Sequence, residues 1–243
     1  MHVALLLGQL EVGGAERQFL GLARGLAGRG HRVTFYTLFS GGGLAGDAAA
    51  VDGLQHRPLV GRRPRIASLA LPQVLRRLRR ALLEDRPEVL HSGLEPTNIL
   101  AALAARESGT PVVWGVRCSG IGLGWKYSLY LRMGARLRRR AAYAICNSRE
   151  GLANHRRCGY LPEQATVIPN GVDVERFQPR PADRERMRAR IGVATREVLV
   201  GLVGRLDPVK RHDLFLQAAA AAAACEPRLR FVCVTPREAH LPP

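Results

Sequence analysis

The chain has 243 residues, of which 37 are lysine or arginine and 20 are aspartate or glutamate, so its formal net charge is +17. With 47% hydrophobic and 23% charged residues, the composition is that of a globular protein and excludes wholesale disorder. No apolar run approaches the ~20 residues of a membrane-spanning helix, and five cysteines without a C-x-x-C pair argue against a disulfide framework or a zinc site.

The predicted elements alternate between strand and helix. An apolar strand at 3–7 ends in glycines, apolar residues from 15 to 26 recur at helical spacing, and a strand follows at 32–38. The stretch 39–53 is rich in glycine and alanine and predicts a loose loop. Such alternation predicts an α/β fold with a parallel sheet, in which ligands bind at the carboxyl ends of the strands. The later elements are expected at 88–91, 97–106, 111–116, 142–146, 198–203, 218–224 and 230–234.

Two glycines stand between the first predicted strand and the first predicted helix, in the segment GQLEVGGAE at 8–16. Gly13 and Gly14 let backbone N–H groups approach a phosphate, and the start of a helix adds partial positive charge. The alternative is an ordinary tight turn, because the dinucleotide pattern G-x-G-x-x-G is not matched.

One of two later segments also follows a predicted strand. In VGRLDPVK at 203–210, the cations Arg205 and Lys210 stand where two positive charges can hold a diphosphate. The alternative is a solvent-exposed turn with ordinary charges. The segment VIPNGVD at 167–173 carries the turn signal Asn-Gly, and its alternative is a plain loop.

These segments together resemble the family 4 retaining glycosyltransferases, which have the GT-B fold. The resemblance is carried by GGAE near the start, IPNGVD with a following F-x-P, and VGRL-x-x-x-K, in that order. WGVR at 114–117, NS at 147–148 and HRRCGY at 155–160 are similar to connecting segments of the family's amino-terminal domain. The resemblance implies a complete Rossmann-like acceptor-binding domain at 1–172. A linker and the incomplete start of a Rossmann-like nucleotide-sugar-binding domain are implied at 173–243.

The resemblance also implies the reaction, which is transfer of a sugar with retention from a nucleotide-sugar donor to a lipid-linked or envelope glycan acceptor. Arg205 and Lys210 match the family's diphosphate-binding pair, with Gly13 and Gly14 beside the donor phosphates. Their charges would neutralise the leaving diphosphate. No metal or other cofactor is expected, since this chemistry needs none and no D-x-D segment is present.

The chain departs from the family where the family carries H-x-H. Here the residues are HSG, so His91 is kept and the second histidine is Gly93. His91 is therefore a candidate catalytic residue, and the alternative is a strand-end histidine without a catalytic role. Glu16, Glu95 and Asn98 are candidate contacts to the acceptor, with helix capping as the alternative for the latter two.

A larger departure lies near the carboxyl end. The family's donor domain carries a glutamate pair, E-x₇-E, that occurs nowhere in this sequence, and TPRE at 235–238 replaces an expected glycine turn. Segments below ~70 residues rarely fold alone, and 47 residues run from 197 to 243. We therefore expect a truncated member, or a fragment, in which this chain alone has impaired transfer or none.

Two basic, leucine-containing stretches, 60–87 and 126–140, predict amphipathic helices that lie on anionic lipid. The alternative is a solvent-exposed arginine face. The expected location is the cytoplasm, including the inner face of the cytoplasmic membrane. The arginines concerned are Arg76, Arg77, Arg79, Arg80, Arg138, Arg139 and Arg140.

Two other classes of function remain open on the sequence. One is a non-catalytic module that binds an acceptor or a membrane surface, which the missing glutamates and Gly93 favour. The other is a nucleic-acid binder, which charge alone suggests. Only 5% of residues are aromatic and no recognition module is evident, so no specific nucleic acid is expected as a partner. The expected partners are a nucleotide-sugar, a lipid-linked or glycan acceptor, and an anionic membrane.

Overall fold

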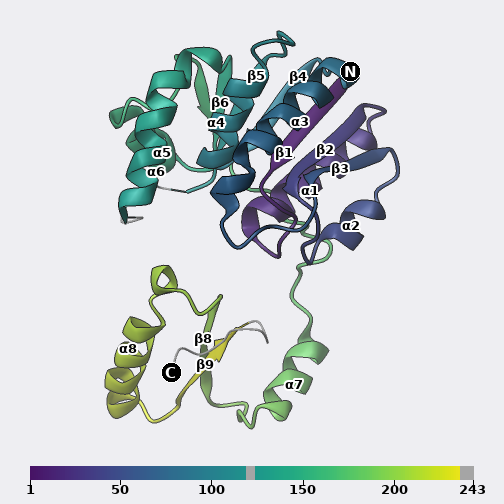
Figure 1. Cartoon of the computed structure of the whole chain (residues 1–243). Coiled ribbons are helices and arrows are strands. Elements are labelled where there is room, and N and C mark those ends of the chain that lie inside the picture. Colours follow the sequence, from purple (N-terminus) through teal and green to yellow (C-terminus); the bar gives the residue numbers. More distant parts are fainter. Residues whose placement is uncertain (119–123, 236–243) are drawn as a thin grey trace. The chain divides into compact units, whose positions relative to one another are not determined.

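A computed structural model describes residues 1–118 and 124–235 (Figure 1). The chain divides into two compact units, Met1–Gly171 and Val172–Pro243. Three residues of the TPRE segment, 236–238, lie outside the described residues. Within the described part, no helix combines the length and apolar character needed to cross a bilayer.

The first unit is built on a parallel sheet of seven strands, in the order β3-β2-β1-β4-β5-β6-β7 (Figure 1). The chain order reverses between β1 and β4, because β2 and β3 lie on one side of β1 and the later strands on the other. Parallel α/β sheets bind ligands outside the carboxyl ends of the strands at such a reversal. The strands are β1 (His2–Leu7), β2 (Arg32–Phe39), β3 (Leu54–Val60), β4 (Val89–Gly93), β5 (Val112–Val116), β6 (Tyr143–Cys146) and β7 (Ala165–Val167).

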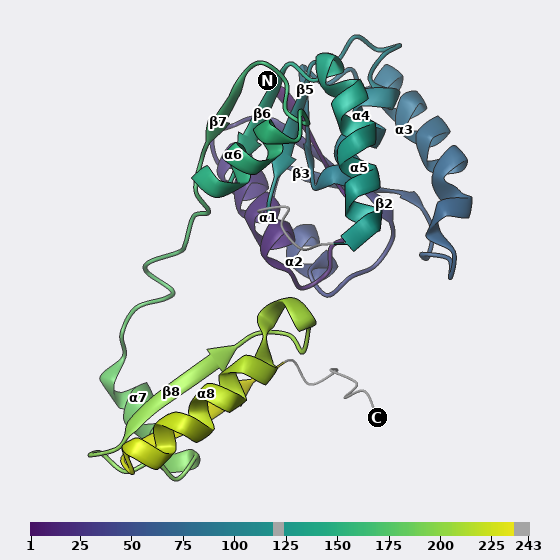
Figure 2. The same ribbon diagram turned by 90° about the vertical axis from the view of Figure 1, so that its left-hand side faces the viewer.

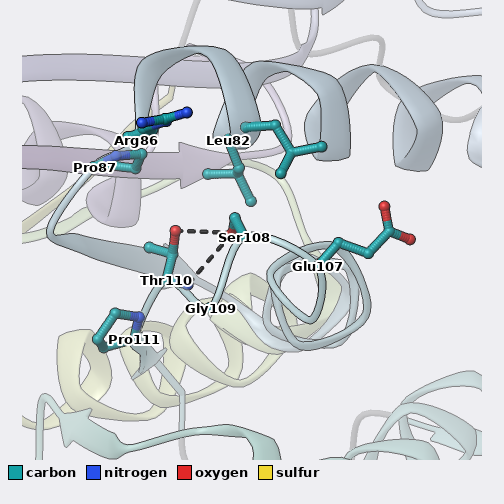
Figure 3. Close-up of a pocket in the computed structure, with 9 residues that line it drawn as sticks. Leu82, Arg86, Pro87, Glu107, Ser108, Gly109, Thr110 and Pro111 are labelled. Carbon is teal, nitrogen blue, oxygen red and sulfur yellow. Dashed lines mark hydrogen bonds between the residues drawn. The ribbon is translucent and has the colours of Figure 1, made fainter.

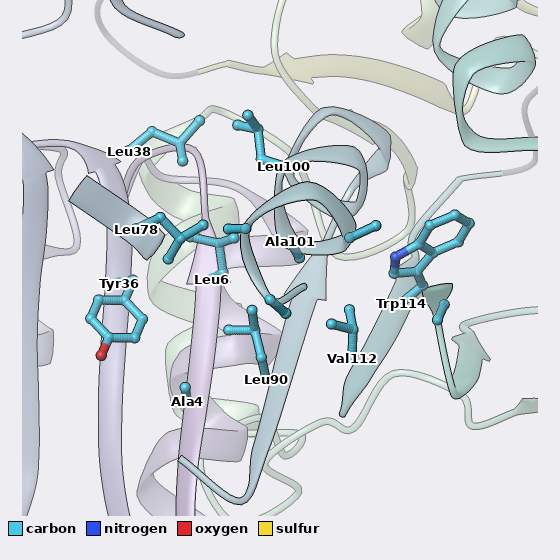
Figure 4. Packing of buried hydrophobic residues seen from close by; sticks show 14 of the residues in the cluster. Ala4, Leu6, Tyr36, Leu38, Leu78, Leu90, Leu100, Ala101, Val112 and Trp114 are labelled. Atoms are coloured by element: carbon cyan, nitrogen blue, oxygen red, sulfur yellow. The ribbon is translucent and has the colours of Figure 1, made fainter. Parts of the chain in front are cut away.

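Helices cover both faces of this sheet, which explains why β1 is buried along its whole length and β2 and β4 along nearly all of theirs. On one face, Phe19 of α1 packs with Phe35. On the other, Leu78 of α3 belongs to the same buried cluster as Leu6 and Trp114 (Figure 4). The helices α3, α4 and α5 pack side by side (Figure 2). The helix bounds are α1 (Gly14–Ala27), α2 (Ala45–Ala49), α3 (Leu71–Asp85), α4 (Glu95–Ala104), α5 (Gly124–Leu137) and α6 (Arg149–Arg157).

The expectation of a loose loop over 39–53 is wrong. Leu44 is buried and its N–H donates to the carbonyl of Leu10 at 2.9 Å, and α2 follows directly. Gly42 has a φ of +105°, and a Cβ at this position would fall 2.2 Å from the carbonyl oxygen of Leu10. Only glycine allows this close approach, so the glycines hold the loop against the segment that leads into α1.

Two strands were missed by the sequence analysis. β3 contains Gln55, His56 and Arg57, and it lies at the sheet edge, where polar residues and Pro58 are tolerated. β7 has three residues and is too short to show a period. Both are edge strands, with a single neighbour each, so burial shapes their sequences less than it shapes those of the central strands.

The second unit contains α7 (Pro181–Arg190), β8 (Val198–Val203), α8 (His212–Cys225) and β9 (Leu229–Val234). β8 and β9 form a parallel pair, and α8 connects them as the alanine run predicted. In the described part of this unit, apolar side chains remain exposed on strand and helix. Val203 is 79% exposed and Leu216 of α8 is 59% exposed. The described part of this unit therefore contains the beginning of a Rossmann-like domain, in which other elements do not fully cover the apolar side chains.

Candidate functional site

Three segments singled out in the sequence meet at the carboxyl edge of the first unit. The side chain of Gln18, on α1, holds Gly171 of the IPNG segment with two hydrogen bonds. Its Nε2 donates to the Gly171 carbonyl at 2.8 Å, and its Oε1 accepts from the Gly171 N–H at 2.9 Å. Arg117, of WGVR, donates from Nη1 to Oδ1 of Asn170 at 3.3 Å. Helix α1, the end of β5 and the chain after β7 are thus joined at one place.

The glycine turn opens α1. Gly13 is the N-cap with extended backbone, and its N–H donates to the carbonyl of Glu11 at 3.0 Å. A Cβ on Gly13 would fall 2.2 Å from Oε2 of Glu16, while Gly14 has open space around its Cα. The Glu16 carboxylate therefore lies at the positive end of α1, where it is favourable. An incoming phosphate at this turn has to displace that carboxylate.

His91 lies on β4, beneath the carboxyl edge, and is 5% exposed. Its ring stacks on Phe19 with centroids 4.7 Å apart, and Nδ1 donates to the Val113 carbonyl at 3.0 Å. Burial, together with the nearby charge of Arg117, lowers the pKa of His91 to about 4. His91 is therefore a neutral, buried ring that supports Phe19, which fits the strand-end alternative better than a surface-exposed catalytic group.

The packing explains why the second histidine of the family pattern is absent. A Cβ on Gly93 would fall 2.6 Å from Cε2 and Cζ of Phe19 and 2.7 Å from Cδ2 of Leu7. Real Cβ atoms do not approach other atoms so closely, so Phe19 occupies the space that a side chain at 93 would need.

Asn98 is completely buried, and its amide joins three elements. Nδ2 donates to the Gly115 carbonyl at 3.1 Å and to the Tyr160 hydroxyl oxygen at 3.0 Å, while Oδ1 accepts from Ser92 Oγ at 2.7 Å. The N-cap of α4 is Leu94, which makes no side-chain capping bond, so the capping alternative for Asn98 is wrong. The structure gives Asn98 a positioning role inside the fold and no exposed atom for an acceptor.

Glu95 is also buried, in a network that neighbouring helices close. Its Oε1 accepts from the Tyr127 hydroxyl at 2.8 Å and lies 3.4 Å from Nε2 of His155 and 3.7 Å from Sγ of Cys118. Nδ1 of His155 donates to the carbonyl of Gly151. Burial and the charge of Glu95 raise the pKa of Tyr127, so its hydroxyl stays a proton donor.

The same network contains one group of side chains that could hold a metal ion. The ligand atoms of Glu95, Cys118 and His155 all lie within 4.8 Å of one another. Carboxylate, thiolate and imidazole groups suit zinc. The Tyr127 hydroxyl lies within hydrogen-bond distance of all three groups, at 2.8 Å, 3.1 Å and 2.8 Å respectively, and this bonding accounts for their approach without an ion.

In the second unit, Arg205 and Lys210 lie on the loop after β8, and both are exposed to solvent. The Lys210 stem packs over Gly204, where a Cβ would lie 3.5 Å from its Cγ. Nη2 of Arg205 is 3.7 Å from Oδ2 of Asp207, an exposed and weak pairing. Both cations are therefore accessible at the carboxyl end of a parallel strand.

The α3 arginines proposed as a membrane surface are partly bound into the fold. Nη1 of Arg77 donates to the carbonyl of Leu59 at 2.7 Å, and Arg80 pairs with Glu84 at 2.7 Å. Arg76 is exposed. Arg77 and Arg80 nevertheless remain exposed to solvent.

Helix α5 carries an exposed apolar stripe that the sequence analysis missed. Trp125, Leu129 and Met133 are 74%, 48% and 39% exposed, and their spacing of four residues puts them on one side of the helix. The exposed turn Arg138–Arg140 follows the helix. We call Trp125, Leu129 and Met133 the α5 stripe.

A shallow hollow lies away from these segments (Figure 3). It is lined by Arg86 and Pro87, before β4, and by residues 107–111, before β5. Ser108 and Thr110, on the loop before β5, hydrogen-bond to each other at 2.9 Å. Because these connections precede their strands, the hollow is at the amino edge of the sheet, opposite to the edge where such sheets bind ligands.

Comparisons with known proteins agree on one group. The family model described as Glycosyltransferase Family 4 matches residues 12–176. The putative glycosyltransferase EpsF of Bacillus subtilis is 30% identical over 162 residues, which are 60% of this chain and 40% of that protein. A D-inositol 3-phosphate glycosyltransferase of Geodermatophilus obscurus is 46% identical over 72 residues, which are 30% of this chain and 16% of that protein.

Solved structures show the same fold. The Anabaena protein Alr3699/HepE, crystallised with UDP-glucose, gives a TM-score of 0.78 at 20% identity, with 96% of this chain and 60% of that chain covered. The lipopolysaccharide outer core galactosyltransferase WaaB gives 0.63 at 12% identity, with 97% and 68% covered. The chain thus spans 16% to 40% of these two curated relatives and about 60% of the Anabaena structure.

Proposed function

Because the chain belongs to Glycosyltransferase Family 4 and has a GT-B-like fold, we propose that it serves transfer of a sugar, with retention, from a nucleotide-sugar to a glycan or lipid-linked acceptor. Its first unit is a complete Rossmann-like domain, and its second is an incomplete one. The observation that carries the proposal is the meeting of the GGAE helix, WGVR and IPNG at the carboxyl edge of the first unit. The Anabaena neighbour binds UDP-glucose, which supports a nucleotide-sugar donor.

The two units take different parts in this proposal. The first presents the acceptor at the β1–β4 reversal, and the second binds the donor diphosphate through Arg205 and Lys210. Two accessible cations at the end of β8 suit an anion that gains charge as the sugar–phosphate bond breaks. This role needs no metal from the chain.

Transfer by the 243 residues alone is expected to be weak or absent. The described part of the second unit has a two-stranded sheet with exposed apolar residues, and the sequence contains no E-x₇-E pair to hold sugar and ribose. The alternative function is then a non-catalytic acceptor-binding module. A turnover assay with nucleotide-sugars and lipid-linked acceptors decides between them, and clear product formation by the purified chain would contradict this expectation.

Substituting Arg205→Met is expected to weaken UDP binding to the chain about tenfold or more, because it removes a charge-assisted hydrogen-bond donor. Lys210→Met should act in the same direction. In a longer protein that contains this chain and catalyses sugar transfer, Arg205→Met should lower the rate of transfer about 10²–10³-fold. Titration calorimetry with UDP measures the binding. Arg228→Met, which removes an arginine paired with Glu226 elsewhere in the unit, is the matched control. Equal UDP affinity in Arg205→Met and wild type would contradict the assignment.

A peripheral membrane role is the second candidate, and the α5 stripe favours it. Exposed apolar side chains beside Lys126 and the Arg138–Arg140 turn give a helix both features of an interfacial anchor. Anionic lipid attracts each basic residue by about 1 kcal/mol near the surface.

Replacing Trp125 and Leu129 of the α5 stripe by serine is expected to lower binding to anionic vesicles about tenfold or more, because each buried apolar side chain contributes roughly 1.5–3 kcal/mol. Co-sedimentation at low and high salt measures the loss. The control is Leu214→Ser, since Leu214 is 52% exposed and lies on α8, outside both basic stretches. The fluorescence emission of Trp125 should shift to the blue when the wild-type protein binds vesicles. If neither the wild-type protein nor the variant binds vesicles, the proposed membrane role is contradicted.

A further inference from the structure

Arg117 stands directly after β5, at the edge where the three family segments meet. Its guanidinium carbon lies 5.2 Å from the centroid of the Phe19 ring, and the same ring stacks on His91. The bond from Nη1 to Asn170 fixes the guanidinium from a second side. The group is therefore held in one place by an aromatic ring and an amide, both from other elements.

Arg117 has no counter-charge among the described residues, since no carboxylate there lies within ion-pair distance. Its Nε is closed off from solvent and makes no hydrogen bond within the described part. Its one side-chain partner there is the neutral oxygen of Asn170. Burial lowers the pKa of Arg117, because burial disfavours the charged form of the guanidinium. A half-buried cation of this kind is stabilised when an anion joins it.

The location of Arg117 indicates which bound molecule would supply this anion. Phe19 and Leu7 close around Gly93 between β1 and β4, so the ring that carries Arg117 stands at the reversal of strand order. Ligands of parallel α/β sheets bind at that reversal, and the proposed function places the acceptor there. The donor diphosphate has its own cations on the second unit, so Arg117 is available to a different group.

We propose that Arg117 binds an oxyanion of the acceptor, a phosphate or a carboxylate, and so makes this chain selective for anionic acceptors. The planar guanidinium can donate two parallel N–H bonds to either group. Phosphate and carboxylate can both accept such a pair of hydrogen bonds, and the probes described below distinguish the two groups. The inference rests on the proposed function in one respect, namely that the first unit receives the acceptor.

The test uses the whole 243-residue chain and four probes at constant ionic strength. These are inorganic phosphate, glucose 1-phosphate, glucuronate and neutral glucose. The Arg117 Nε–H resonance, assigned with Arg117→Lys, should move with the anions and stay fixed with glucose. Affinity should fall about tenfold or more in Arg117→Met and less in Arg117→Lys, which keeps the charge but loses the planar fork. Arg24→Met, an exposed arginine of α1, is the matched control.

Each outcome bears on the proposal. A response to both phosphates but not to glucuronate, or the reverse, supports it and identifies the acceptor's anion. An unmoved Nε–H resonance with all anions overturns it, as does equal affinity in Arg117→Met and wild type. The resonance is read on wild-type protein, so poor folding of a variant does not decide the result. Loss of UDP binding in Arg205→Met with an unchanged Arg117 response separates this inference from the donor assignment.

Discussion

Substituting Gly93→His, which restores the H-x-H pattern of the family, is expected to unfold the first unit and to add no catalytic group. Even the Cβ of alanine would stand 2.6 Å from two atoms of the Phe19 ring and 2.7 Å from Leu7. The ring cannot yield easily, because it is stacked on His91 and carries Arg117. Overpacking of this kind costs about 1–3 kcal/mol, and we expect Gly93→Ala at the upper end and the histidine beyond it.

Urea unfolding followed by tryptophan fluorescence measures this effect, since both tryptophans, Trp114 and Trp125, belong to the first unit. Gly21→Ala is the matched control, because Gly21 lies on α1 with no atom within 4 Å of the added methyl. Replacing the Phe19 ring by the smaller leucine side chain should restore part of the stability lost in Gly93→Ala. In the double variant, we expect a coupling in the free energy of unfolding of about 0.5–3 kcal/mol. An unchanged unfolding midpoint in Gly93→Ala would contradict the packing argument.

The parts of the fold that sequence predicted are those governed by local pattern. Continuous apolar runs gave the central strands, and the alanine run gave α8, because burial on both faces and helix propensity act within a few residues. The edge strand β3 escaped detection since its polar residues obey no such constraint. The loop at 39–53 was misjudged because the demand for Gly42 comes from Leu10, which is distant in sequence.

The candidate site shows the same contrast between features that follow from local sequence pattern and features that depend on residues distant in sequence. The segments GGAE, WGVR and IPNG could be singled out, but the sequence gives no sign that Gln18 binds Gly171 across 153 positions. Nothing local marks Phe19 as the ring that excludes a side chain at 93 and supports Arg117. A basic residue directly after an apolar strand was the available signal for Arg117, and ligand binding at the carboxyl ends of strands made it meaningful.

Phe19 thus links the departure from the family pattern to the rest of the site. The ring fills the space of the second histidine, shields the first, and leaves a guanidinium as the polar group above it. A site built in this way offers a fixed cation where the family pattern offers an imidazole. We propose that this cation gives the site a preference for charge on the bound partner, which the Arg117 titrations test.

The stability of the first unit is expected to fall as the pH drops from about 6.5 towards 4, with His91 responsible for roughly 3 kcal/mol of the loss. In the folded chain, burial lowers the pKa of His91 to about 4, whereas the unfolded chain titrates near 6.5. Between these values the unfolded chain binds more protons than the folded one, so the free energy of unfolding rises with pH. His91 makes its full contribution to the free energy of unfolding above pH 6.5, and this contribution is lost as the pH falls towards 4.

His91→Gln isolates this contribution, because glutamine can still donate to the Val113 carbonyl but does not titrate. The buried His2 and the partly buried His56, whose pKa values are also lowered by burial, act in the same direction and remain in both proteins. The measured quantity is the difference in free energy of unfolding between wild type and His91→Gln at pH 7, 6, 5 and 4.5. Wild type should lose about 1.4 kcal/mol per pH unit relative to the variant over the lower part of this range. Parallel pH curves for wild type and His91→Gln would show that His91 is not held neutral by its burial.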